Sequence, residues 1–112
     1  MKLSILLLLG ASCISSFAQT ISPINGRQLA EWSNGDVNRR KQFDSYVLGT
    51  YRALLSVRRV CPPTGRTDIA NESAALLAVR MGVEEGLFDN DGPASEAVSD
   101  ALAFWYPCTP RK

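Results

Sequence analysis

The chain contains no histidine anywhere in its 112 residues. Histidine is the usual general base at neutral pH and the commonest zinc ligand, so its absence excludes His-dependent catalytic triads and His-containing zinc sites. Cysteine is also scarce, with three residues and none in a Cys-x-x-Cys arrangement. We therefore expect no enzyme activity, no cofactor and no bound metal.

Long apolar runs are missing as well. The longest begins at Leu3 and is too short and too interrupted to supply the roughly 20 apolar residues that a membrane-spanning helix needs. Lys2 before this run and Ser16-Phe17-Ala18 after it form the pattern of a secretory signal peptide. We predict a cleaved signal peptide over residues 1–18, with cleavage between Ala18 and Gln19, followed by a single helical domain over residues 19–112.

A lipoprotein signal is the alternative reading of the same segment. Gly10-Ala11-Ser12 precedes Cys13, as small residues precede the lipid-bearing cysteine in such signals. Gly10, however, stands where a branched aliphatic residue is usual, which favours ordinary cleavage.

The cysteine count depends on that cleavage. Removal of Cys13 leaves two cysteines, Cys61 and Cys108, in an oxidising compartment, where an even pair is most simply a disulfide. Two separate buried thiols are the alternative. A bridge would join the ends of two predicted helices and contribute roughly 4 kcal/mol in the chain-entropy model.

The strongest periodic pattern predicts a long amphipathic helix from Val37 to Val60, capped by Asp36 and stopped by Cys61-Pro62-Pro63. Its apolar residues cover most of the circumference, so we expect the other helices to surround it. Gly49 either permits a close helix crossing or is a tolerated interior glycine.

Three further helices follow from caps and spacing. We predict one over Gly26 to Trp32, one from Thr67 or Asp68 to Met81, and one from Pro93 that ends at Pro107. No period-two alternation indicates a strand. The expected fold is an all-α bundle of four to five helices around a long central helix, with one disulfide. The expected core includes further apolar residues: Trp32, Ile69, Leu76, Val79, Val83, Val98, Ala101, Leu102 and Trp105.

Charge is nearly balanced, at +1 for the whole chain and zero once Lys2 is removed, so nothing global favours nucleic acid or an anionic membrane. Arg39-Arg40-Lys41 and Arg58-Arg59 fit exposed helix faces. The segment between Gly82 and Pro93 is acidic, but it lacks the oxygen-ligand pattern of an EF-hand calcium loop. Solvated loop charge is the simplest reading.

The order of several short motifs resembles the Rap/Tai family. These motifs are Leu29 to Trp32, Tyr46-Val47-Leu48-Gly49, Cys61-Pro62, and the run from Ala101 to Cys108 that ends in Tyr106-Pro107-Cys108. Members of that family are small periplasmic immunity proteins that neutralise peptidoglycan amidase effectors of bacterial type VI secretion systems. The resemblance covers Gly26 to Cys108 and implies an all-α fold, a periplasmic location, a homodimer and protein binding in place of catalysis.

The chain departs from the family in one respect. Family members often carry a second cysteine pair, and Ser33 and Phe43 stand in those neighbourhoods here. This difference leaves the particular effector open.

By resemblance, the predicted function is binding and inhibition of a cell-wall amidase effector. Loops held on a rigid bundle are suited to such contacts, and the acidic segment offers apolar anchors among its charges. The predicted partner-binding residues are Glu84, Glu85, Leu87, Phe88, Asp89 and Asp91. The alternatives are a periplasmic structural or chaperone-like helical protein without a toxin partner and, third, an enzyme that uses the acidic segment.

Overall fold

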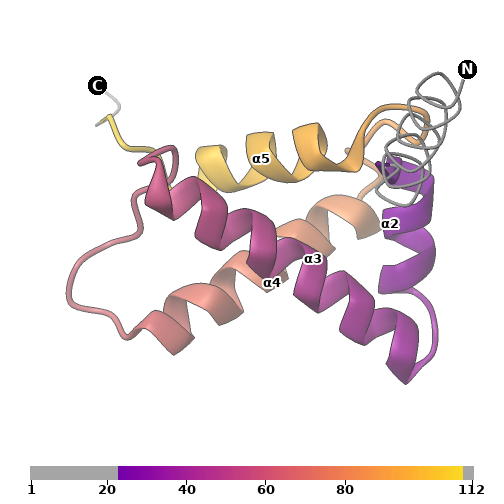
Figure 1. The fold of residues 1–112 in the computed structure, drawn as a ribbon, viewed down its shortest axis with the longest axis horizontal. Coiled ribbons are helices and arrows are strands. Elements are labelled where there is room, and N and C mark those ends of the chain that lie inside the picture. The colour runs from indigo at the N-terminus through magenta and orange to yellow at the C-terminus, as the bar shows by residue number, and fades with distance from the viewer. Residues whose placement is uncertain (1–22, 110–112) are drawn as a thin grey trace, which may run out of the picture.

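The computed structural model describes residues 23–109, and within that range the chain is all-helical (Figure 1). The helices are α2 (Gly26–Ser33), α3 (Val37–Ser56), α4 (Asp68–Glu84) and α5 (Ala94–Trp105). The part described contains one isolated antiparallel bridge, between Asn25 and Pro93, and no strand. This confirms the predicted all-α fold. The predicted signal peptide and Cys13 lie outside the described residues.

Side-chain caps fix where three of the helices begin. Asn25 caps α2 in a capping box with Gln28, Asp36 caps α3 by accepting a hydrogen bond from the Arg39 N–H, and Thr67 caps α4. Each cap satisfies a backbone donor that has no partner inside the helix. Two of these starts, at Asp36 and Thr67, were readable from the sequence.

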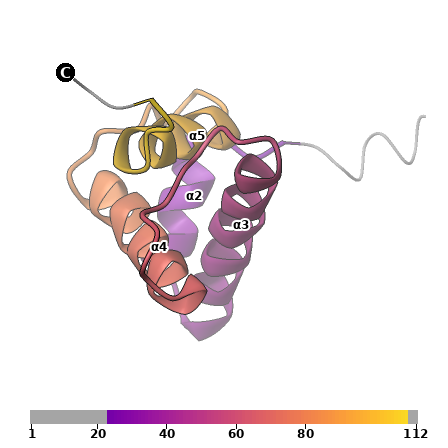
Figure 2. The same ribbon diagram turned by 90° about the vertical axis from the view of Figure 1, so that its left-hand side faces the viewer.

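The helices pack around one core, and every pair of them is in contact. Figure 2 shows α3 and α4 as two walls, with α5 lying across their upper edges and α2 behind. The core draws on all four helices and on two residues beyond helix ends: Leu29, Phe43, Val47, Tyr51, Val60, Ala75, Val79, Ala94, Val98, Leu102 and Tyr106.

The central helix is shorter and less enclosed than its pattern predicts. It ends at Ser56, where Arg58 adopts a φ of 57° and its N–H donates to the Leu55 carbonyl. The Arg59 N–H reaches back to the Leu54 carbonyl, so the end is a Schellman motif with arginine in the left-handed position. Only three α3 residues are buried, all on one face, although α3 contacts each of the other three helices, as expected for the central helix of the bundle.

Two predicted core residues are exposed. Ile69 is 76% exposed because it lies in the first turn of α4, where the core-facing positions are Asn71 and Ala75. The residues of α5 that face the core, Ala94, Val98 and Leu102, are four apart, and Tyr106 continues this series just after the helix. Trp105 falls outside the series and is 54% exposed.

Gly49 is also not at a helix crossing. A Cβ built at this position would meet no atom within 4 Å, so the reading of a tolerated interior glycine holds. In addition α4 continues three residues beyond its predicted end, to Glu84.

The predicted disulfide is confirmed. Cys61 and Cys108 are bonded, with their Cα atoms 4.8 Å apart. Beside the bridge, the Cys61 N–H donates to the Tyr106 carbonyl at 2.9 Å, and the buried Tyr106 hydroxyl donates to the Asn71 carbonyl at 3.1 Å. These contacts tie the end of α5 to α4 and to the segment after α3.

Removal of the disulfide should lower the free energy of unfolding by about 4 kcal/mol, because it frees a loop with a sequence separation of 47 in the unfolded chain. The variant is Cys61→Ala with Cys108→Ala, and urea unfolding gives the measurement. The wild-type chain in reductant should show the same loss. A loss below about 1 kcal/mol would contradict the chain-entropy account.

Stability should also fall at high pH. Burial, and secondarily the nearby Tyr106, raises the pKa of Tyr51 above its ordinary value of 10.0. Above pH 10 the unfolded chain therefore loses this proton before the folded chain does, which favours unfolding. Urea unfolding across that range should show the decline, and Tyr51→Phe should reduce its slope; an unchanged slope would exclude Tyr51 as its source.

Candidate functional site

A groove of about 690 Å³ lies between α4 and α5. Its wall on α4 is the C-terminal half of that helix, its end is the segment that connects the two helices, and its other wall runs the length of α5. We call it the α4–α5 groove. Its lining residues are Ala78, Met81, Gly82, Glu85, Leu87, Phe88, Asp89, Gly92, Pro93, Glu96, Ala97, Asp100, Ala101, Phe104 and Trp105.

Two different faces of α5 are apolar. One face is completely buried and carries Ala94, Val98 and Leu102, spaced four residues apart. The second face carries Ala97 and Ala101 and ends in the two aromatic residues Phe104 and Trp105. A helix that packs by one face normally has a polar opposite side, so the second apolar stripe indicates a surface with another purpose.

Several large apolar side chains that line the groove are exposed. Leu87 is 70% exposed, Trp105 is 54% exposed and Met81 is 39% exposed. Exposed apolar residues are ordinary when scattered, but a group around one concave surface is typical of a binding site.

The charged residues that line the groove are all acidic: Glu85, Asp89, Glu96 and Asp100. Among residues 23–109, the ion pairs are Arg27–Asp91, Arg52–Glu72 and Arg80–Asp44, so none of the four takes part in one. The chain as a whole carries a charge of +1, which makes this acidic rim a local feature.

The connecting segment is held firmly at its start. Gly86 has a φ of 68°, and its N–H donates to the Val83 carbonyl while the Leu87 N–H donates to the Gly82 carbonyl. This Schellman motif needs a residue that tolerates the left-handed region, as glycine does. The Phe88 ring then lies against Gly82, where an added Cβ would stand 2.9 Å from it.

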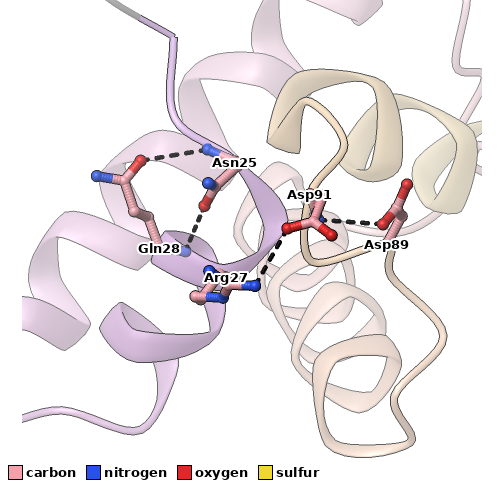
Figure 3. Close-up of polar contacts among 5 residues, drawn as sticks. All are labelled: Asn25, Arg27, Gln28, Asp89 and Asp91. Carbon is pink, nitrogen blue, oxygen red and sulfur yellow. Dashed lines mark hydrogen bonds and ion pairs between the residues drawn. The ribbon is translucent and has the colours of Figure 1, made fainter.

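The end of the same segment is held by α2. Figure 3 shows Arg27 reaching Asp91, with the Asp91 N–H bonded in turn to the Asp89 carboxylate; the distances are 3.1 and 3.0 Å. Two backbone donors in α2 reinforce the contact, since the Gly26 N–H donates to the Gly92 carbonyl and the Arg27 N–H to the Asn90 carbonyl. The loop is therefore docked on the bundle at both ends.

The predicted partner-binding residues divide into two groups. Glu85, Leu87, Phe88 and Asp89 line the groove, whereas Glu84 and Asp91 are exposed outside it. Leu87 projects into solvent, while Phe88 packs against the core.

The α5 side of the groove was not predicted. Its members Glu96, Ala97, Asp100 and Ala101 recur at helical spacing, and two groove residues of α5, Ala101 and Trp105, were expected in the core. The second apolar stripe of α5 was the sequence feature from which this side of the groove could have been predicted.

Elsewhere the described residues offer little chemistry. A shallower hollow of about 460 Å³ is lined by Trp32, Lys41, Gln42, Ser45 and Tyr46. Burial raises the pKa of Tyr46, and a hydrogen bond with Ser95 partly opposes this rise. Across residues 23–109, no three acidic or cysteine side chains gather so that they could hold a metal ion, and no helix is long and apolar enough to cross a membrane.

Comparisons with protein-family models, with curated proteins and with solved structures found no match to this chain.

The docking of the loop on α2 can be tested by substituting two glycines, one at the contact and one away from it. Gly26→Ala should lower the free energy of unfolding by about 1–3 kcal/mol, because the new Cβ would collide with the Asp89 backbone carbonyl. Gly49→Ala is the matched control, and it should raise stability by about 1 kcal/mol, since that site is open and helical. Urea unfolding measures both. Equal effects of the two substitutions would show that the loop does not depend on the close approach at Gly26.

Proposed function

We propose that this chain is an exported binding protein that recognises a protein partner through the α4–α5 groove. In its full form, the proposal is a periplasmic immunity protein that inhibits a peptidoglycan amidase effector of a type VI secretion system.

The observation that carries the binding role is the groove itself. It combines an apolar lining, exposed side chains at Leu87 and Trp105, and an acidic rim. Aromatic and aliphatic anchors in a concave surface, with charges at its edge, are the usual composition of a protein-binding site. The groove extends along all of α5, which suits a segment of polypeptide better than a compact small molecule.

Two features support a site of action outside the cytoplasm. The sequence of residues 1–18 has the pattern of a signal peptide. The Cys61–Cys108 disulfide is of the kind that persists in oxidising compartments such as the bacterial periplasm. Peptidoglycan amidases act in that compartment, and the motif order from Gly26 to Cys108 resembles the immunity proteins that oppose them.

The experiment uses the oxidised mature chain, residues 19–112, and the product of the gene adjacent to its own, which the proposal requires to be a cell-wall amidase. Equimolar chain should slow the cleavage of purified peptidoglycan by the amidase, and the two proteins should co-purify. Leu87→Ser should weaken the complex about tenfold, because the variant removes an exposed apolar anchor. Titration of amidase activity gives the inhibition constants.

Ile69→Ser is the matched control, because Ile69 is equally apolar and exposed but does not line the groove. It should inhibit as the wild type does. A chain that neither binds nor inhibits the amidase, yet suppresses the aggregation of several unfolded proteins, would contradict the immunity role and favour a chaperone-like one.

A further inference from the structure

The α4–α5 groove is lined by both small and large apolar residues. Its lining includes small side chains from both helices, Ala78 on α4 and Ala97 and Ala101 on α5, together with the large and exposed side chains of Met81, Leu87 and Trp105. Helices approach one another most closely over small residues and interlock with large ones at the sides. The shape therefore suits a helix lying between α4 and α5.

Backbone pairing is not available at this surface. Both walls are α-helices, whose backbone donors and acceptors bond within the helix, and the described chain has no strand edge to which an extended peptide could add. Recognition must therefore come from side chains. That favours an amphipathic helix with apolar anchors about one turn apart.

The acidic residues that line the groove determine which charge an incoming helix should carry. Glu85 and Asp89 lie at one end of the groove, and Glu96 and Asp100 lie along α5, with no lysine or arginine among its described lining residues. Cations that flank the apolar face of an incoming helix would meet these carboxylates, whereas an acidic helix would be repelled.

We propose that the α4–α5 groove binds a cationic amphipathic helix of the partner protein. The inference rests on the protein-binding role proposed above and adds the chemistry of the segment recognised. The contact length follows from α5, which has 12 residues, so an occupant of about three turns fits.

The same charges disfavour the other occupants. A second copy related by two-fold symmetry would place one acidic rim against another. An anionic membrane surface would meet the same repulsion. The basic run Arg39-Arg40-Lys41 of a second copy would satisfy the charge, but Val37 is the only well-exposed large apolar residue beside it, because Trp32 and Tyr46, which line a hollow with Lys41, are partly buried.

The test uses two synthetic peptides of about 14 residues with identical leucines at helical spacing, one flanked by lysines and the other by glutamates. Fluorescence anisotropy of the labelled peptides measures binding to the mature chain. The lysine peptide should bind at least about tenfold more tightly at low salt, and its advantage should shrink at 0.5 M salt, where the Debye length falls to a few ångströms.

Charge reversal provides the second arm. Glu96→Lys with Asp100→Lys should weaken binding of the lysine peptide at least about tenfold and strengthen binding of the glutamate peptide. Glu31→Lys, at an exposed position on α2 outside the groove, is the control and should change neither affinity. Urea unfolding establishes that the variants are folded.

Equal binding of the two peptides, or unchanged binding by the double variant, would overturn the inference. So would concentration-dependent dimerisation that Glu96→Lys with Asp100→Lys abolishes, because the groove would then hold a second copy. The amidase assay separates this proposal from the function. A double variant that still inhibits the amidase fully would refute the groove chemistry alone, whereas peptide selectivity without amidase inhibition would refute the immunity role alone.

Discussion

The position of α5 is the constraint on which the rest of the structure depends. This helix is fixed at both ends by contacts with distant parts of the chain. At its start, the Ala94 N–H donates to the Ile24 carbonyl at 3.0 Å. At its end, Tyr106 is held by Asn71 and by the segment that carries the disulfide. Because both ends are tied, these contacts set where α5 lies relative to α4 and therefore where the α4–α5 groove forms.

Much of the fold follows from local rules that the sequence displays. Asp36 and Thr67 begin helices because their side chains can accept the backbone hydrogen bonds that the first turn leaves open. The disulfide was predicted as the pairing of the two cysteines that would remain after cleavage of the predicted signal peptide, and the structure contains it. The caps depend on residues close together in the sequence, and the disulfide prediction depends on the number of cysteines. Both can therefore be predicted without a structure.

The parts that could not be predicted depend on how the helices meet. Trp105 and Leu102 fit one helical pattern equally well, and only the direction of α5 relative to α4 decides that Leu102 is buried while Trp105 reaches solvent. The end of α3 is similar, because Val57 and Val60 continue the apolar period, yet the chain must turn at Arg58 to bring Cys61 to Cys108. The loop side of the candidate site was readable as an acidic segment with apolar anchors. Its α5 side could be recognised as part of the site only from the position of α4 opposite it.

The contacts at the two ends of α5 also bear on the order in which the protein matures. Residues 24 to 26 bond to residues 92 to 94, and the bridge joins Cys61 to Cys108, so both ends of α5 are held by earlier parts of the chain. A nascent chain that lacks its final third therefore has neither α5, which covers part of the core, nor Cys108, the partner of Cys61. Completion of the fold therefore requires nearly the whole of the described chain, and a chain truncated before α5 would leave uncovered the surfaces of α3 and α4 against which α5 packs.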